Sequence, residues 1–487
     1  MKDVLTPKQM RACDLNTEEN GIPTLTLMEN AGFQITQHII NNYPDKKRVS
    51  IYSGVGGNGG DGFVVARLLL NHGYKVHLKL LARPENIKNK DSITNWKALN
   101  NCLKADTNLK ITIIRDSKDI VPDNADIILD AILGTGVNGK IREPISSAID
   151  TINNSPAVVL SVDVPSGLDP LTGDVFDKCV IAHNTLTLHK PKTGLTADVK
   201  QYTGELSVLD IGIPRVSELF VGKGDLIHIL SPKVSSHKGE NGSVLIIGSN
   251  SDYIGAVVFA AESALKMGVD LVYIVAPSIS ADVIKSYNPN FIVKAVEGNL
   301  LKETHFDEIM DLVDRVDSVL IGSGAGLSED TGKLFNKLVQ SIDKVMVLDA
   351  DALKLVDKEN IIGSKTIVTP HTREFETFFQ KELPENDDKK IELLSSLSRE
   401  YNTVITLKGV YDIITSPDDY KLNSTGNQGM TVGGTGDVLA GITVALTCKC
   451  DVFTAAYLAT YIIGTAADNL FKSHGFNYTS KDLLDLL

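Results

Sequence analysis

The chain has 487 residues, more than one ordinary hydrophobic core accommodates, so two or three domains are expected. Its apolar fraction of 43% and charged fraction of 22% are globular values, and its net charge of −13 argues against general nucleic-acid binding. No apolar run reaches the roughly 18 residues of a membrane helix, and the N-terminus has no apolar signal region. The five scattered cysteines indicate a reducing compartment, so we expect a cytoplasmic protein.

Short β-branched segments alternate with longer amphipathic segments along almost the whole chain. This alternation predicts parallel sheets covered by helices on both faces. A turn-rich stretch near residues 215–240 separates two halves without an internal repeat, so we predict domains at 1–215 and 222–487. The predicted strands are Arg48–Tyr52, Lys75–Leu81, Ile111–Ile114, Ile127–Leu129, Val158–Val162, Leu186–Leu188, Gly204–Pro214, Val244–Ile247, Leu271–Val275, Ser318–Ile321, Val345–Leu348, Thr366–Thr369 and Val404–Leu407.

A glycine-rich loop, Gly54–Gly62, follows the first predicted strand and precedes a predicted helix at Phe63–Asn71. Glycines let the backbone approach a ligand closely, and exposed N–H groups suit a phosphate. The loop contains the spacing G-x-G-x-x-G, but the next strand is followed by Ala82-Arg83-Pro84 rather than by an acidic residue. The pattern therefore favours a nucleotide-phosphate loop that is not the usual dinucleotide fingerprint.

Two later strands of the first half end in carboxylates, Asp130 and Asp163, each followed by a turn that contains glycine. Ligands of open α/β sheets bind at such strand ends. The alternative is that each aspartate caps a helix. Two such positions together with a glycine-rich loop favour a ligand site.

The first half resembles the NAD(P)H-hydrate epimerases, the YjeF N-terminal family, through five segments in the family's order: Leu27–Gly32, Gly54–Gly62, Asp130–Gly136, Asp163–Leu168 and Pro191–Leu195. The resemblance implies a Rossmann-like three-layer domain in which Asn58, Asp130 and Ser166 hold a potassium ion. It also implies substrate contacts from Gly57, Asn58, Gly59, Gly60, Asp61, Gly134, Thr135, Gly136, Val137, Asn138, Gly139, Lys140 and Asp163. The chain departs from the family at Gly57, where asparagine is usual.

Epimerising a hydrated nicotinamide at C6 requires proton transfer close to the ring. Asp130 is the candidate acid/base because a carboxylate near the ring can move protons. By the resemblance Asp130 would also be a potassium ligand, and the sequence leaves both roles open.

The second half contains another glycine-rich loop, Gly433-Gly434-Thr435-Gly436-Asp437, ahead of an apolar helix predicted over Val438–Leu446. Backbone N–H groups that converge at a helix N-terminus favour an anion, and Asp437 stands where a base is needed when a hydroxyl attacks phosphorus. The alternatives are a capped glycine turn here, a plain loop histidine at His371 and a plain turn at Lys408-Gly409. Together the three segments indicate a nucleotide site for phosphoryl transfer, and the absence of a P-loop motif excludes a Walker-type mechanism.

These features resemble the ribokinase-like superfamily, and residues 222–487 resemble its NAD(P)H-hydrate dehydratase branch. The resemblance implies that Ala256, Gly324, His371 and Asp437 contact the hydrate, and that Lys408, Gly409, Val410, Tyr411, Asp412 and Gly436 bind the adenine nucleotide. The chain departs from the branch's usual motifs GPGLG and TPHPGE at Ser323, Ala325, Thr372 and Arg373, and has Gln428 where proline is usual.

The sequence therefore predicts two doubly wound α/β domains in a bifunctional repair enzyme, an isomerase and lyase, for hydrated NADH and NADPH. Asp437 would deprotonate the C6 hydroxyl, which attacks the terminal phosphorus of the nucleotide. Backbone amides and Mg²⁺ would stabilise the developing charge before phosphate is eliminated. The fusion of the two domains is the bacterial and archaeal arrangement, which favours ADP over ATP.

Two alternatives to this function remain. One is a vitamin-precursor kinase, such as a hydroxyethylthiazole kinase, fused to a nucleotide-binding domain. The other treats the first domain as a non-catalytic scaffold, although a scaffold has no need of Asn58, Asp130 and Asp163. The expected partners are the small molecules NADHX, NADPHX and ADP, with no nucleic acid and no membrane, and we expect a homo-oligomer.

Overall fold

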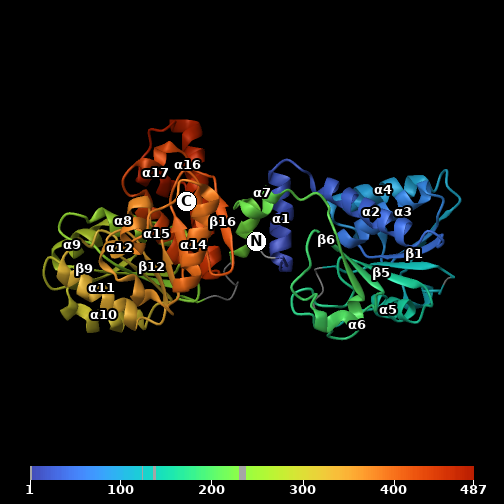
Figure 1. The fold of residues 1–487 in the computed structure, drawn as a ribbon, viewed down its shortest axis with the longest axis horizontal. Helices are drawn as coiled ribbons and strands as arrows, with labels where there is room; N and C mark the ends of the chain where they lie inside the picture. The colour runs from blue at the N-terminus through green and yellow to red at the C-terminus, as the bar shows by residue number, and fades with distance from the viewer. Residues whose placement is uncertain (1–2, 123, 135–138, 230–236) are drawn as a thin grey trace. The chain divides into compact units, whose positions relative to one another are not determined.

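The computed structural model describes residues 3–122, 124–134, 139–229 and 237–487. The chain forms two compact units, one ending at Ser217 and the other beginning at Glu218 (Figure 1). Each unit has its own sheet and its own hydrophobic cores.

The first unit is built on a seven-stranded sheet whose described pairings are all parallel, in the order β3-β2-β1-β4-β5-β6-β7. The central strands β4 and β5 are buried along almost their whole length because helices cover both faces, which is why they contain continuous apolar runs. The strands are β1 (Arg48–Ser53), β2 (Lys75–Leu80), β3 (Leu109–Ile113), β4 (Ile127–Ala131), β5 (Val158–Val162), β6 (Asn184–Leu188) and β7 (Glu205–Leu209).

Helices α2, α3 and α4 pack on one face of this sheet, and α5 lies on the other face (Figure 1). Helix α1 starts at a capping box in which the Thr6 hydroxyl accepts from the Gln9 N–H. The helices are α1 (Pro7–Glu19), α2 (Thr24–Asn42), α3 (Gly57–Asn71), α4 (Lys90–Cys102), α5 (Ile145–Asn153), α6 (Lys200–Thr203) and α7 (Arg215–Leu219), with 3₁₀ turns η1 (Pro84–Asn86), η2 (Ser117–Asp119) and η3 (Ala197–Val199).

The second unit has a nine-stranded sheet in the order β10-β9-β8-β11-β12-β13-β14-β15-β16. It is parallel through β14, and the hairpin β15–β16 adds two antiparallel strands at its edge. The strands are β8 (Ser243–Ile247), β9 (Leu271–Pro277), β10 (Phe291–Val296), β11 (Ser318–Ile321), β12 (Val345–Leu348), β13 (Thr366–Val368), β14 (Val404–Leu407), β15 (Asp412–Thr415) and β16 (Tyr420–Asn423).

One core of this unit joins the sheet to α8, α15, α16 and α17, and the other joins it to α10–α14. The helices are α8 (Gly255–Lys266), α9 (Ser278–Tyr287), α10 (Phe306–Val313), α11 (Glu329–Ser341), α12 (Ala352–Leu355), α13 (Thr372–Phe379), α14 (Asp387–Tyr401), α15 (Thr435–Leu446), α16 (Val452–His474) and α17 (Ser480–Asp485), with 3₁₀ turns η4 (Lys223–His228), η5 (Glu303–His305), η6 (Lys358–Ile361) and η7 (Gln428–Thr431).

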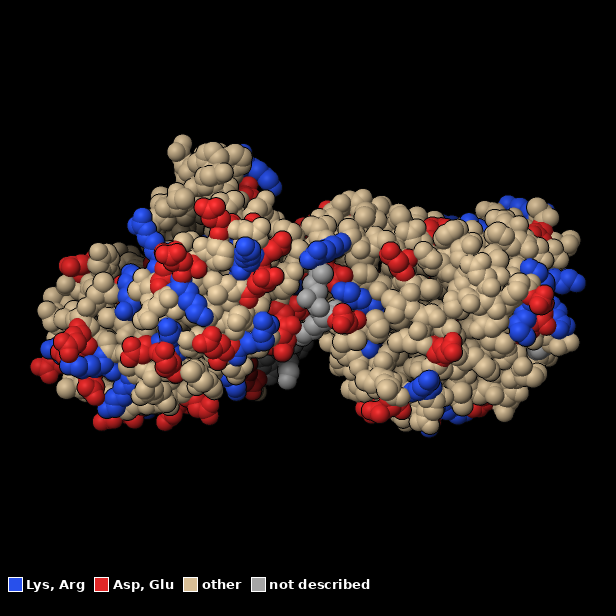
Figure 2. Space-filling view, in the orientation of Figure 1, with Lys and Arg blue, Asp and Glu red and all other residues tan. Residues whose placement is uncertain are grey.

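Both units confirm the predicted class of doubly wound α/β domains. Strands β10, β15 and β16 were not predicted; β15 and β16 are only four residues long, and β10 has a half-exposed pattern without a continuous apolar run. None of the described helices is long and apolar enough to cross a membrane. On the face drawn in Figure 2, acidic and basic side chains are interspersed over the second unit.

Candidate active sites

A cavity of about 650 Å³ in the first unit is lined by the loops that follow β1, β4 and β5. Strands β1 and β4 are neighbours although β2 and β3 lie between them in the chain, so this is the point where the strand order reverses and ligands of such sheets bind. The predicted contact residues that line the cavity are Gly57, Asn58, Asp61, Gly134 and Asp163.

Gly59, Gly60, Gly139 and Lys140, the other predicted residues of this group that the structure describes, do not line the cavity. A Cβ atom on Gly59 would lie 2.1 Å from the Gly54 carbonyl oxygen, and one on Gly60 would lie 2.5 Å from the Ser92 hydroxyl. These two glycines therefore allow α3 to pack closely behind the loop. Among the described residues Gly139 and Lys140 are also outside the lining, and Thr135, Gly136, Val137 and Asn138 lie outside the described residues.

Asp163 stands just after β5 with a positive φ of 64°, an uncommon conformation for a residue other than glycine. Its carboxylate pairs with the ammonium of Lys192, whose side chain is 1% exposed, and accepts a hydrogen bond of 3.0 Å from the Leu188 N–H. Lys192 also donates to the Leu188 carbonyl at 2.9 Å. The segment Pro191–Leu195 was recognised in the sequence, but the role of its lysine was not.

Four further carboxylates line the same cavity, among them those of Asp14 on α1 and Asp61 on α3. Burial raises the pKa of Asp14 to about 6, with a further contribution from the Asp163 charge. Burial, followed by the charges of Asp163 and Asp14, raises the pKa of Asp61 well above its usual value. Sequence reasoning missed Asp14 because α1 carries no motif and only the tertiary fold brings it to the cavity.

Asp130, the last residue but one of β4, is 1% exposed and is not among the residues that line the cavity. Four donors satisfy its carboxylate: the Ser166 hydroxyl at 2.6 Å, the Ser166 N–H at 2.8 Å, the Ser161 hydroxyl at 2.9 Å and the Ile132 N–H at 3.3 Å. Burial raises its pKa, and these hydrogen bonds oppose the rise.

The three predicted potassium ligands meet around the carbonyl of Leu133. Asn58 Nδ2 and Ser166 Oγ each donate to that carbonyl at 3.2 Å, and Ser166 also bonds Asp130. Within the described ranges no group of three or more His, Cys, Asp or Glu side chains could hold a metal. The carboxylate, hydroxyl and carbonyl oxygens gathered here are of the type that hard cations prefer, although the Asp130 carboxylate already accepts four hydrogen bonds and Asn58 presents its N–H groups.

The second unit brings two of the predicted motifs together at the ends of β13 and β14. His371 and Lys408 form a parallel bridge, and the Lys408 N–H donates to the Pro370 carbonyl at 2.9 Å. The His371 ring also caps α13, because its Nδ1 accepts from the Arg373 N–H at 3.1 Å. Its side chain is 51% exposed, so the ring remains open to a ligand while it caps the helix.

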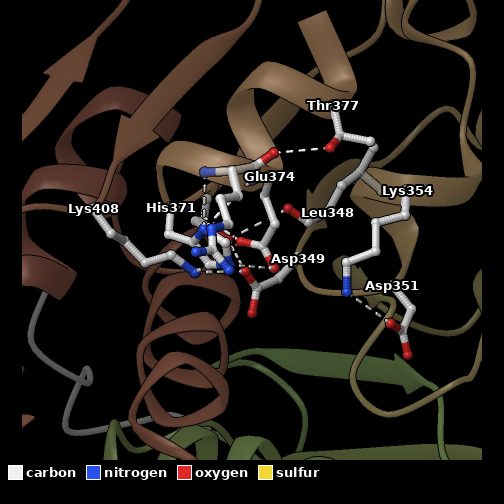
Figure 3. A network of polar contacts seen from close by, with 10 residues as sticks. Leu348, Asp349, Asp351, Lys354, His371, Glu374, Thr377 and Lys408 are labelled. Carbon is white, nitrogen blue, oxygen red and sulfur yellow. Dashed lines mark hydrogen bonds and ion pairs between the residues drawn. The ribbon is translucent and has the colours of Figure 1, made fainter. Parts of the chain in front are cut away.

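Lys408 lies at the centre of a polar network (Figure 3). Its Nζ donates to Asp349 Oδ1 at 3.0 Å and lies 3.7 Å from Glu374 Oε2. Asp349 Oδ1 also accepts from the Thr369 hydroxyl at 2.8 Å. Burial lowers the pKa of Lys408, but the charges of Asp349 and Glu374 outweigh burial, and the net change is a rise.

Helix α15 begins at Thr435, after Gly434 in the left-handed region at φ 98°. A Cβ atom on Gly434 would lie 2.7 Å from the Phe259 ring, so this turn requires glycine. Asp437 occupies the first turn of α15. Burial and, after it, the Asp349 charge raise the pKa of Asp437 to about 7.

The remaining predicted contacts lie on neighbouring loops. A Cβ atom on Gly324, after β11, would lie 3.1 Å from the Cβ of Ala256 on α8. In the turn between β14 and β15, the Asp412 carboxylate accepts from the Gly409 N–H at 3.1 Å and the Asn423 amide at 3.0 Å. The side chains between them, Val410 and Tyr411, are 95% and 54% exposed.

Sequence reasoning did not assign roles to Asp349, Glu374 and Thr369. The signal for Asp349 was its place after β12 in Leu348-Asp349-Ala350-Asp351, and Glu374 was visible in the segment that contains His371. The sequence alone did not show that the residues after β12 and β13 come together at Lys408, which follows β14.

The fold and the two polar sites define a two-unit α/β protein with sites at the carboxyl ends of both sheets. The description "NAD(P)H-hydrate dehydratase" matches residues 244–487, and "YjeF-related protein N-terminus" matches residues 24–194. The bifunctional NAD(P)H-hydrate repair enzyme Nnr of Methanothermobacter thermautotrophicus is 44% identical over 99% of this chain and 94% of its own length. That of Pyrobaculum aerophilum is 38% identical over 99% of this chain and 97% of its own length.

The chain therefore belongs to the family of bifunctional NAD(P)H-hydrate repair enzymes. Among solved structures, the ADP/ATP-dependent NAD(P)H-hydrate dehydratase from Bacillus subtilis, co-crystallised with ATP and Mg²⁺, is 26% identical with a TM-score of 0.47. The alignment covers 54% of this chain and 94% of that chain.

Proposed function

We propose that this protein repairs hydrated NADH and NADPH, with the epimerase in residues 1–215 and an ADP-dependent dehydratase in residues 222–487. The observation that carries the proposal is full-length membership of the repair-enzyme family, together with two separate polar sites at the ends of two doubly wound sheets. The family membership does not favour the kinase or scaffold alternatives. We include a cytoplasmic setting and a homo-oligomer in the proposal.

In the dehydratase, Asp437 is the base that takes the C6 hydroxyl proton, and a carboxyl pKa of about 7 suits a base that works near neutral pH. The backbone N–H groups of the first turn of α15 face the transferred phosphoryl group and stabilise its charge. Lys408 neutralises the phosphates, and Mg²⁺ brought by the nucleotide supplies further positive charge. Ala256, Gly324 and His371 contact the hydrate, whereas Gly409–Asp412 and Gly436 contact the nucleotide.

In the epimerase, the Gly57–Asp61 segment and Gly134–Lys140 bind the dinucleotide, and Asp163 contacts the hydrated ring. By the family resemblance Asn58, Asp130 and Ser166 would hold potassium, which would supply a positive charge beside the loop after β4. The Asp130 carboxylate, buried and accepting four hydrogen bonds, holds this loop and Ser166 in place. An acid/base role for Asp130 stays a prediction beside it, and the carboxylates that line the cavity are those of Asp14, Glu18, Asp61, Asp91 and Asp163.

The test is incubation of the full chain with racemic NADHX, ADP and Mg²⁺ while the absorbance of restored NADH is followed. We expect complete conversion, with inorganic phosphate and AMP released in equal amounts to the NADH formed. A stable phosphorylated product without NADH would contradict the dehydratase and support a kinase. Conversion that stops at half of the racemate would contradict the epimerase.

A further inference from the structure

Asp349 is a buried carboxylate of the second site that belongs to neither the hydrate contacts nor the nucleotide contacts proposed above. Its side chain is 3% exposed. Oxygen Oδ1 accepts from the Thr369 hydroxyl at 2.8 Å and from Lys408 Nζ at 3.0 Å (Figure 3). The carboxylate is therefore held by residues that follow β13 and β14.

The second oxygen of Asp349 faces the start of α15. A Cβ atom on Gly436 would lie 3.9 Å from Asp349 Oδ2 and 3.7 Å from Lys408 Nζ. The aspartate and the lysine thus approach the first turn of α15 side by side. This is the place where unpaired helix N–H groups favour an anion.

Lys408 needs a fixed partner to stay at this place. A lysine ammonium is a compact charge on a flexible stem, and ordering the stem costs conformational entropy. The Asp349 bond at 3.0 Å is shorter than the 3.7 Å contact with Glu374, and the aspartate is more buried than the lysine, whose side chain is 21% exposed. Asp349 is therefore the main anchor, and the exposed side of Lys408 can reach a ligand.

Asp349 also acts on Asp437 through space. After burial, its negative charge is the largest cause of the raised pKa of Asp437. The other charges facing Asp437 are Lys408, which lowers this pKa, and Asp351, whose effect in the same direction as Asp349 is smaller. A carboxylate beside a like charge holds its proton to higher pH.

We propose that Asp349 is a positioning residue for the dehydration, holding the Lys408 ammonium at the start of α15 and placing a negative charge beside the base Asp437. This role rests on the proposed function of the second unit. In that step the C6 oxygen bonds to the terminal phosphorus of ADP, and the bond from that phosphorus to the bridging oxygen breaks. AMP leaves, and the C6 hydroxyl proton moves to Asp437.

The test is the pH dependence of kcat/KM for S-NADHX in Asp349→Asn, which keeps the shape of the side chain and removes its charge. The acid limb of this profile reports the free-enzyme pKa of the base, which must be deprotonated to act. Removal of a neighbouring negative charge lowers that pKa, so the limb should move down by about 1 pH unit. The maximal kcat should also fall about tenfold or more, because Lys408 loses its anchor.

Two further variants separate this role from a merely structural one. Asp349→Glu keeps the negative charge, so the acid limb of its kcat/KM profile should stay at the wild-type pH, although its kcat falls. Asp351→Asn is the matched control, since it loses the same charge two residues away, and its limb should move less than that of Asp349→Asn. Thr369→Val removes only the hydroxyl that donates to Asp349 and should lower kcat several-fold without moving the acid limb. This variant replaces Asp349→Asn as the test if Asp349→Asn does not fold.

The inference would be overturned if folded Asp349→Asn kept the wild-type kcat and the wild-type position of the acid limb. So would a Thr369→Val variant with unchanged kcat if Asp349→Asn cannot be purified. Failure of the proposed function would look different, since wild-type protein would then form no NADH from S-NADHX and ADP.

Discussion

The two sites each pair an aspartate at a strand end with a lysine, but they expose these pairs differently. In the first unit Lys192 is 1% exposed and Asp163 9%, and both ammonium and carboxylate also bond the backbone of Leu188. In the second unit Asp349 is as deeply buried, but Lys408 is 21% exposed and faces the start of α15. The first pair is deeply buried in the wall of the cavity and is held by backbone bonds, whereas the lysine of the second pair is more exposed.

The charge balance differs as well. Around Lys192 the cavity collects the carboxylates of Asp14, Asp61 and Asp163, and this crowding of like charges favours the protonated form of a carboxyl. Around Lys408 the carboxylates Asp349 and Glu374 are balanced by the α15 N-terminus, which favours an anion. The same kind of aspartate–lysine pair is thus suited to different ligands in the two units, because the surrounding charges differ.

The largest expected effect that separates the two sites is that of Asp437→Asn. Dehydration should fall by about 10²–10⁴, because a positioned base is lost while the N–H groups of α15 remain. Epimerisation should be unchanged, since Asp437 belongs to the second unit. The measurement is turnover of S-NADHX with ADP beside epimerisation of R-NADHX, and wild-type dehydration would show that Asp437 is not the base.

Asp130→Ala should reverse this pattern. Epimerisation should fall at least about 100-fold, because the variant loses the carboxylate of the proposed potassium cluster and four donors lose their acceptor. Pure S-NADHX should be dehydrated at the wild-type rate, and a racemate should stall near half conversion apart from slow spontaneous epimerisation. Rapid complete conversion of the racemate would assign the epimerase elsewhere, and wild-type epimerisation should depend on potassium.

Lys192→Met tests whether burial makes the first pair structural. Removal of one partner of a buried pair leaves an uncompensated charge and should destabilise the unit by about 3–5 kcal/mol. Lys90→Met, which breaks the exposed pair with Glu18, should cost about 0–1 kcal/mol. Urea unfolding can be followed by the fluorescence of Trp96, the single tryptophan, which lies in the first unit. Equal midpoints for the two variants would contradict the contrast in burial.

The second site should respond to pH near neutrality. Because burial and Asp349 raise the pKa of Asp437 to about 7, kcat/KM for dehydration should fall about tenfold per unit below that pH. The loss follows from protonation of the base, so activity is present above the raised pKa and disappears as pH falls through it. A profile that stays flat from pH 8 to pH 5 would remove Asp437 from this role.

The smallest expected difference concerns the phosphoryl donor. ADP should be used several-fold better than ATP, a preference that rests on the fused two-domain arrangement. Side-by-side turnover with each nucleotide at equal Mg²⁺ measures it. A preference for ATP would correct the donor without affecting the dehydratase assignment.

The alternation of β-branched and amphipathic segments was sufficient to predict both doubly wound units. The buried parallel strands β5, β8 and β12 each contain at least three consecutive apolar residues, so their pattern is local and strong. The antiparallel hairpin β15–β16 was missed because its four-residue strands lie at the edge of the sheet, where pairing partners decide the structure.

The sequence by itself determined the motifs that belong to strand ends, such as Asp130, Asp163 and His371, because parallel sheets place such residues on one rim. It also determined the motif of Asp437, which lies in the first turn of α15. Tertiary structure decided which of these line a cavity. It buried Asp130 among four donors and brought Asp14 from an unmarked helix into the cavity. It also brought Asp349, Thr369 and Lys408 together from three strand ends. The burial of a side chain and the distances between remote residues are fixed only when distant segments pack together, so a local sequence pattern does not contain them.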